Sequence, residues 1–149
     1  MNGQQNHVLK MLDEIAAKEV ELATEALARA MKEVKEAQSK FDMLMDYRKG
    51  YLDNLSSSLA KGMNAEAYQN FQNFLKKLDH AISGQKEVVT YAEQHVKVSR
   101  ALWQESQRKK RSYDVLIERA DKRAEKVEQK KDQKMMDEFA TRITRNRHK

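Results

Sequence analysis

The feature that most constrains this chain is a heptad repeat of apolar residues, interrupted once between about residues 54 and 64. Before the interruption, two strips recur every seven positions: Val20, Leu27, Val34 and Phe41 form one, and Ala16, Ala23, Ala30, Ala37, Leu44 and Tyr51 form the other. After residue 70 the pattern restarts in two strips. One contains Leu75, Ile82, Val89, Val96, Trp103, Lys110, Ile117 and Ala124, and the other contains Phe71, Leu78, Gln85, Ala92, Ser99, Ser106, Tyr113, Ala120 and Val127. A repeat sustained over about five heptads is typical of the a and d positions of a coiled coil.

Intrinsic disorder is the competing interpretation, because charged residues make up 35% of the chain and its mean hydropathy is −0.92. Low hydropathy and high charge are the usual signature of disordered segments. The heptad periodicity favours helices instead, and the chain contains no proline to interrupt them. We therefore expect long helices that pair along a narrow interface formed by the two strips, which we call the seam.

The interruption predicts a reversal of the chain. It contains Ser56, Ser57 and Ser58, whose hydroxyls compete for backbone hydrogen bonds, and then Gly62 and Asn64, which suit a helix end and a helix start. A short connection implies antiparallel neighbours. We predict an all-α fold: a long two-helix antiparallel coiled-coil hairpin in a single elongated domain over 1–149. Its first helix covers about 5–55, the turn about 56–64, and the second helix about 65–140, with a protruding C-terminal part.

Alignment of the strips about this turn predicts which residues face each other. Tyr51 should lie opposite Phe71 and Leu44 opposite Leu78; further along, Ala30 should face Ala92 and Val20 should meet Trp103. Lys110 is the one charged member of its strip.

The net charge of +6 is concentrated in the last third of the chain. Residues 100–149 hold 16 Lys and Arg against 9 Asp and Glu, whereas residues 1–99 hold 13 against 14. We expect an acidic partner for the C-terminal third.

No constellation of catalytic residues is present. Cysteine is absent, and the four histidines do not have the spacing of metal ligands. No phosphate-binding, dinucleotide-binding or nucleophile-elbow motif occurs. The sequence therefore predicts a non-enzyme without cofactor or metal. A secretory signal and an apolar run of membrane-spanning length are also missing, so we expect a soluble, cytoplasmic protein without direct membrane insertion.

Two groups contain apolar residues beyond those that the two helices need in order to pair. Five of the nine Phe and Tyr residues crowd near the turn: Tyr47, Tyr51, Tyr68, Phe71 and Phe74. Packing near the turn is one explanation, and a docking surface is the other. The second group is Met135, Met136, Phe139 and Ile143, which the first helix is too short to cover; a frayed terminus is its alternative explanation.

The basic run Arg108–Arg111 and the lysines at 130, 131 and 134 raise a different possibility. Acidic residues recur among them, and no aromatic residues are interleaved for base stacking, so specific nucleic-acid binding is the weaker hypothesis. A basic coiled-coil scaffold that binds nucleic acid or another structural protein is kept as the alternative function.

Several segments resemble the FliJ family of the bacterial flagellar type III export apparatus. They are Leu12-Asp13 through Lys18-Glu19-Val20, Met43-Leu-Met-Asp-Tyr47, Gln69-Asn-Phe-Gln-Asn-Phe74 and Asp132-Gln-Lys-Met-Met-Asp-Glu-Phe139-Ala. The resemblance covers nearly the whole chain and includes the spacing between segments. Its terminal segment is the most telling one, because heptad composition does not predict it.

The resemblance implies an antiparallel coiled coil similar to the γ stalk of rotary ATPases. It implies binding to the hexameric export ATPase FliI, to the export-gate protein FlhA and to export chaperones, at the cytoplasmic face of the cell membrane. Carried over by position, the FlhA contact maps onto Leu44, Tyr47, Tyr51, Phe74, Leu78 and Ala81, with Lys40 and Gln85 beside it. The FliI contact maps onto Leu12, Ile15, Met136, Phe139 and Arg142.

Overall fold

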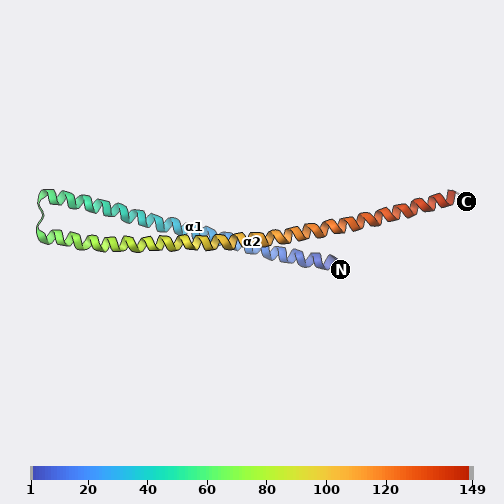
Figure 1. Ribbon diagram of the computed structural model, residues 1–149, viewed down its shortest axis with the longest axis horizontal. Coiled ribbons are helices and arrows are strands. Elements are labelled where there is room, and N and C mark those ends of the chain that lie inside the picture. Colours follow the sequence, from blue (N-terminus) through green and yellow to red (C-terminus); the bar gives the residue numbers. More distant parts are fainter. Residues whose placement is uncertain (1, 148–149) are drawn as a thin grey trace. The chain divides into compact units, whose positions relative to one another are not determined.

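The computed structural model describes residues 2–147, and they form two helices (Figure 1). Helix α1 covers Asn2–Lys61 and helix α2 covers Ala65–Arg147. The described part of the chain contains no strand. The predicted all-α antiparallel hairpin is thereby confirmed.

Three residues, 62 to 64, reverse the chain direction between the helices. Gly62 adopts φ = 89°, a conformation that L side chains rarely take, and its N–H donates to the Leu59 carbonyl at 3.2 Å. The side-chain oxygen of Asn64 then accepts a hydrogen bond from the Ala67 N–H at 2.8 Å. Gly62 thus ends α1, and Asn64 caps the first turn of α2.

Helix α1 ends at Lys61 rather than near residue 55, and the three serines are helical instead of forming the turn. The physical reason is packing: Leu55 is buried and Ser58 is half-buried, so the spacing of 4 and 3 continues beyond Tyr51. Burial of this last turn outweighs the preference of serine for local backbone bonds. Helix α2 likewise extends to Arg147 rather than to about residue 140.

Contacts divide the chain into two compact units, which we describe separately. The turn unit comprises Leu22–Gln104, and its two helical segments run antiparallel on either side of the turn. Its buried residues lie on the predicted strips, apart from Leu55, which extends one of them: Ala30, Ala37, Leu55, Leu78, Val89, Ala92 and Ser99. Ala30 and Ala92 are both buried, as expected for small residues at a narrow seam.

The terminal unit contains the residues up to Glu21 together with those from Glu105 onward. Ala16 is buried, and the flanking seam residues on α2 are half-buried as far as Ala120. From residue 121 to residue 147 every side chain is exposed, including the predicted strip members Ala124 and Val127. We call residues 121–147 the C-terminal segment.

In the part of the chain that the structure describes, neither helix contains a stretch apolar enough to cross a membrane.

Candidate docking surfaces

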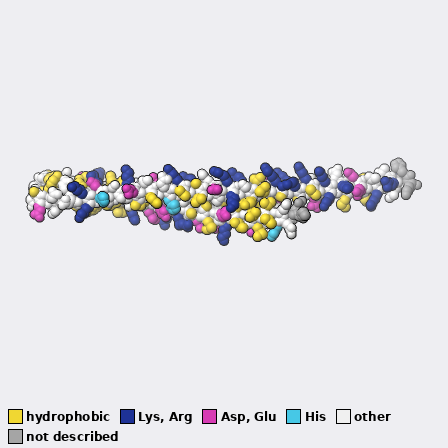
Figure 2. All heavy atoms as spheres, turned by 60° about the horizontal axis from the view of Figure 1, so that its bottom comes forward, with side chains coloured by type: hydrophobic (Ala, Val, Ile, Leu, Met, Phe, Trp, Pro, Cys, Tyr) yellow, Lys and Arg dark blue, Asp and Glu magenta, His cyan; other side chains and the backbone are white. Residues whose placement is uncertain are grey.

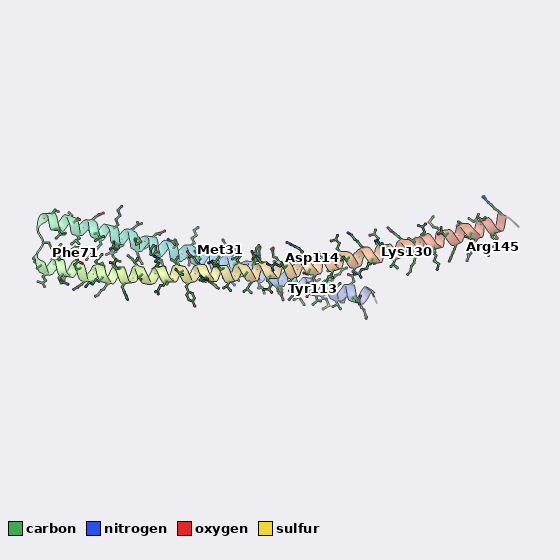
Figure 3. The ribbon with its side chains drawn as sticks, in the orientation of Figure 1. Met31, Phe71, Tyr113, Asp114, Lys130 and Arg145 are labelled. Carbon is green, nitrogen blue, oxygen red and sulfur yellow. The ribbon has the colours of Figure 1, made fainter. Side chains whose placement is uncertain are left out.

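Four aromatic residues gather beside the turn, and we call them the aromatic tip: Tyr47, Tyr51, Phe71 and Phe74. The ring centroid of Tyr51 lies 4.9 Å from that of Phe71, which confirms the predicted pairing, and 4.8 Å from that of Phe74. Tyr47 meets Phe74 edge-on with centroids 6.4 Å apart. These separations fall in the range of favourable aromatic pairs. Figure 3 shows Phe71 next to the turn.

The four rings differ in how much of their surface is free. Tyr51 and Phe71 are half-buried, and the Tyr51 hydroxyl donates to the Phe71 carbonyl at 3.4 Å. Burial raises the pKa of the Tyr51 phenol, and the neighbouring Tyr47 phenol adds to this shift. Tyr47 and Phe74, in contrast, are 55% and 40% exposed. The inner pair packs the helices together, whereas the outer pair presents rings to solvent.

An ion pair fixes the two helices beside the aromatic tip. Arg48 of α1 donates from Nε to Asp79 of α2 at 2.6 Å. The hydrogen bond to Asp79, aided by its charge, raises the pKa of the Arg48 guanidinium. Because Arg48 and Asp79 come from different helices, the pair holds the helical turns that carry Tyr47 and Phe74 in one register.

The other residues predicted for the FlhA contact occupy different environments. Leu44 is half-buried, Leu78 is buried in the seam, and Ala81 is exposed. Of the two flanking residues, Lys40 is exposed, while Gln85 lies in the seam and donates to the Ala37 carbonyl at 3.0 Å. A partner could therefore reach Tyr47, Phe74 and Ala81 directly, whereas Leu78 acts through packing.

The C-terminal segment carries a second set of exposed apolar residues. Met135, Met136, Phe139 and Ile143 are between 41% and 72% exposed, at spacings that gather them along one side of a helix. Figure 3 places Lys130 and Arg145 on this segment, and Figure 2 shows Lys and Arg side chains along the surface of the molecule. The segment therefore combines apolar anchors with positive charge. Arg142, predicted for the FliI contact, is exposed here as well.

On α1, the residues predicted to share that contact are exposed too: Leu12 is 37% and Ile15 is 55% exposed. They flank the seam residues Asp13 and Ala16, so they point away from the interior of the terminal unit. Near the start of α1, Asn6 donates to Asp121 of α2 at 3.1 Å, so this end of α1 lies beside a part of α2 that comes well before Met136 and Phe139.

Sequence reasoning missed a polar cluster in the seam of the terminal unit. Lys110 donates to both carboxylate oxygens of Asp114, at 2.8 and 2.9 Å, and to Asp13 across the seam at 3.3 Å. These hydrogen bonds, first to Asp114 and then to Asp13, raise the pKa of Lys110, and Lys110 is the main cause that lowers the pKa of Asp114. The sequence could have predicted the contact between Lys110 and Asp13, because the register that places Ala30 opposite Ala92 also places Asp13 near Lys110.

No cluster of three or more His, Asp or Glu side chains suited to hold a metal ion occurs within residues 2–147.

Comparison with known protein families gives a match to the family described as flagellar FliJ protein, over residues 5–149. The chain belongs to the FliJ family. The matched residues include both the aromatic tip and the C-terminal segment, so both surfaces lie within the part of the chain that the family shares.

Two relatives are similar to this FliJ-family chain over most of its length. It is 32% identical to the flagellar FliJ protein of Escherichia coli strain K12 over 134 residues, which is 90% of this chain and 91% of the relative. It is 30% identical to the flagellar FliJ protein of Salmonella typhi over 138 residues, covering 93% and 94% of the two chains. The FliJ relatives therefore match it nearly end to end.

Proposed function

We propose that this chain is a non-enzymatic binding component of the flagellar type III export apparatus, and that its aromatic tip contacts the export gate FlhA. Membership of the FliJ family supports the assignment to the flagellum. The observation that carries the contact is the exposure of Tyr47 and Phe74 in a cluster whose packing role Tyr51 and Phe71 already fill.

Exposed rings of this kind suit a docking surface. Tyr47 and Phe74 hold each other edge-on, so their positions are fixed before a partner arrives, and less side-chain entropy is lost on binding. Aromatic side chains are also over-represented among the residues that dominate binding energy at interfaces. Ala81 adds an exposed small residue one helical turn beyond Leu78.

The second part of the proposal assigns the C-terminal segment to the export ATPase FliI, as a stalk similar to the rotary-ATPase γ subunit. Met136 and Phe139 are exposed on a helix that α1 no longer covers, and lysines and arginines surround them. Such a helix face is suited to a groove or ring lined by apolar and acidic residues. Leu12 and Ile15 belong to the same proposed contact. Escort of export chaperones and a position at the cytoplasmic face of the membrane rest on the family resemblance alone.

The FlhA contact is tested by the affinity of purified FlhA for the chain and for its Tyr47→Ala and Phe74→Ala variants. We expect each substitution to weaken binding by about tenfold or more, as for anchor residues that contribute about 1.4 kcal/mol or more. Circular dichroism of each variant should retain the helical content of the parent chain.

Met45→Ala is the matched control, because Met45 is 43% exposed on α1 and lies two residues before Tyr47, so it is on a different face of the helix. It should leave FlhA affinity unchanged. Loss of helicity in the Tyr47 or Phe74 variants would mean that these rings only pack the tip. Unchanged affinity in folded variants would contradict the proposed contact.

A further inference from the structure

The first turns of α1 carry most of their large apolar side chains on exposed faces. We call residues 3–15 the arm, and Val8, Met11 and Ile15 in it are each at least half exposed. No side chain of the arm is buried, whereas Ala16, directly after it, is 1% exposed. Packing of a buried face is what usually holds a helix in place, so the arm is held to α2 by little of it.

One large apolar side chain of the arm lies in the seam. Asp13 meets Lys110 across the seam, and in the register set by this contact Leu9 lies opposite Tyr113 in the next layer. Leu9 and Tyr113 are both half-buried. The layers on either side carry polar residues of the arm, Asn6 and Asp13, which are half-buried as well. Undocking of the arm therefore exposes little of its apolar surface.

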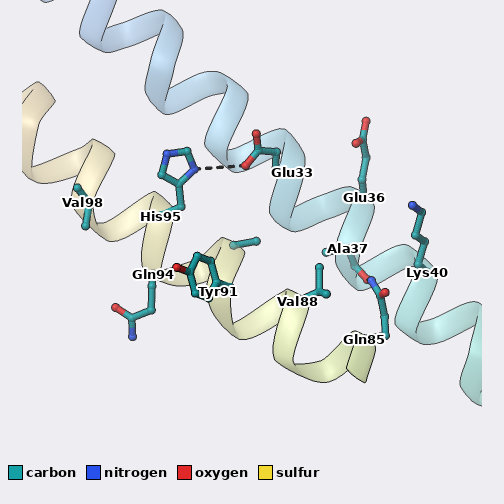
Figure 4. A pocket seen from close by; sticks show the side chains of 11 residues that line it. Glu33, Glu36, Ala37, Lys40, Gln85, Val88, Tyr91, Gln94, His95 and Val98 are labelled. Atoms are coloured by element: carbon teal, nitrogen blue, oxygen red, sulfur yellow. Dashed lines mark hydrogen bonds and ion pairs between the residues drawn. The ribbon is translucent and has the colours of Figure 1, made fainter. Parts of the chain in front are cut away.

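The turn unit is held differently. Its ion contact between Glu33 and His95, at 3.3 Å, lies beside the seam rather than within it (Figure 4). The seam next to this contact is closed by buried small residues, including Ala30, Ala37 and Ala92. Undocking there would open a packed seam, so we expect the arm to open while the turn unit stays closed.

The ionic contact of the arm costs little to break. Lys110 donates to both carboxylate oxygens of Asp114, at 2.8 and 2.9 Å, and lies farther from those of Asp13, at 3.2 and 3.3 Å. Asp114 is four residues further along the same helix, so it stays with Lys110 when the arm leaves. Asp13 then enters water, and neither charge is left buried without a partner.

Opening also removes an unsatisfied polar atom. Asn6 donates its side-chain amide to Asp121 at 3.1 Å, but its Oδ1 is buried and has no hydrogen-bond partner among the described residues. A buried acceptor without a partner is unfavourable, and water satisfies it once the arm has opened. The closed state therefore contains one unfavourable group that the open state lacks.

We propose that the arm is a reversible cover, which undocks as a unit and closes over Tyr113, Ile117 and Ala120 of α2. These three residues are half-buried in the closed state, while Ala124 and Val127, which follow them on the same strips, are exposed. Opening thus lengthens the apolar strip that α2 presents. A partner that uses the covered residues competes with the arm, so its apparent affinity is reduced by the fraction of open chains. The cover goes beyond the proposed function, because it requires no particular partner.

Native-state hydrogen exchange of the full chain, resolved to single amides, tests the cover. We expect the amides of residues 7–15 to share one protection factor, at least tenfold lower than those of residues 27–50 on the same helix, because an undocked helix of this length is marginal in water. Protection that falls steadily toward residue 2 would show that the helix end frays turn by turn. Protection equal to that of residues 27–50 would show that the arm stays closed. Either result overturns the proposal.

Replacement of the polar layer tests its part in the opening. A double Asp13→Leu and Lys110→Leu variant places apolar side chains in facing positions, so exchange of the arm should slow about tenfold or more, with residues 27–50 unchanged. Glu14→Leu with Arg111→Leu is the matched control, because it makes the same kinds of replacement at the neighbouring exposed positions. It should leave exchange of the arm as in the parent chain. Equal exchange in the two double variants would contradict the proposal.

A disulfide that locks the arm gives the second test, and the chain has no native cysteine to interfere. A double Leu9→Cys and Tyr113→Cys variant, oxidised at low protein concentration, should form this disulfide within one chain. The lock should slow exchange over residues 7–15 about tenfold or more, and reduction should restore the faster exchange. Exchange that stays fast in the locked chain would mean that the arm unwinds without leaving α2, which contradicts a cover that undocks as a unit.

Discussion

Lys110 shows how one charged residue is accommodated at a position that the heptad pattern otherwise fills with uncharged side chains. Its ammonium lies between Asp13 of α1 and Asp114 of α2, so its charge is balanced from both helices. A register shifted by one heptad would leave Lys110 in the seam without the Asp13 carboxylate. We infer that the cluster selects the register of the terminal unit, as polar residues at seam positions do in other coiled coils.

The pH dependence of stability tests this cluster. The pKa of Asp114 is lowered in the folded chain, so its contribution to stability is complete above the ordinary aspartate pKa of about 4 and is lost as pH falls through the lower folded pKa. Thermal unfolding at about pH 5 and about pH 3 should therefore show a smaller fall in Tm for Lys110→Met than for the parent chain.

Lys122→Met is the control for that comparison, because Lys122 pairs with Glu118 at 3.4 Å on a well-exposed surface. It should retain the pH dependence of the parent chain, since exposed ion pairs contribute little to stability. If Lys110→Met and the parent chain lose the same Tm on acidification, the cluster does not contribute as described.

Replacement of Gly62 and of Gly50 by alanine should change the stability of the hairpin in opposite directions. Gly62 has φ = 89°, whereas Gly50 lies inside α1, and an added Cβ there would meet nothing within 4 Å. Gly62→Ala should destabilise the hairpin by about 1 kcal/mol or more, and Gly50→Ala should stabilise it by about 0.5–1 kcal/mol. Chemical denaturation measures both, and a stabilising Gly62→Ala would contradict the turn geometry.

At the scale of the helices, the seam is the part that the sequence predicts best. The strips containing Ala30, Ala37, Leu78 and Ala92 are buried where the heptad count places them, and Tyr51 meets Phe71 as the register requires. The prediction of these buried positions succeeds because a seven-residue repeat assigns each residue to one face of its helix. The end of α1 was mispredicted, since serine preference is local and weak compared with the burial of Leu55.

The alanine seam sets the distance between α1 and α2 in the turn unit. Ala30 has no exposed surface, so a larger side chain must force the helices apart or adopt a strained rotamer. Ala30→Leu should therefore destabilise the chain by about 1–3 kcal/mol, although leucine is more apolar. Ala28→Leu, on the exposed face of α1, should change the free energy of unfolding by much less. Equal effects at both positions would mean that the seam is loosely packed.

Across the whole molecule, the candidate sites were only partly predictable. The heptad strips contain Tyr51 and Phe71 but not Tyr47 and Phe74, and the structure agrees with this division, because the first pair is half-buried and the second pair is exposed. Leu78 is buried as its place on a strip predicts, whereas the family resemblance assigns it to the FlhA contact, because position in a family motif does not distinguish a contact residue from one that supports it. The polar contacts of Lys110 depend on side-chain reach, which a heptad count does not describe.

We propose that the chain acts by binding, with the C-terminal segment engaging the export ATPase and the aromatic tip engaging the gate. Met136 and Phe139 can be changed without touching any packed residue, because both are exposed beyond the paired part of α2. A double Met136→Ala and Phe139→Ala variant therefore isolates the first contact, and Tyr47→Ala is its control in the other unit.

The most direct test is the ATPase activity of purified FliI, at a concentration too low for it to assemble fully, with and without this chain. The parent chain and Tyr47→Ala should stimulate the activity, and the double variant at 136 and 139 should not. Absence of stimulation by the parent chain, or equal stimulation by the double variant, would contradict the assignment of the C-terminal segment to the ATPase.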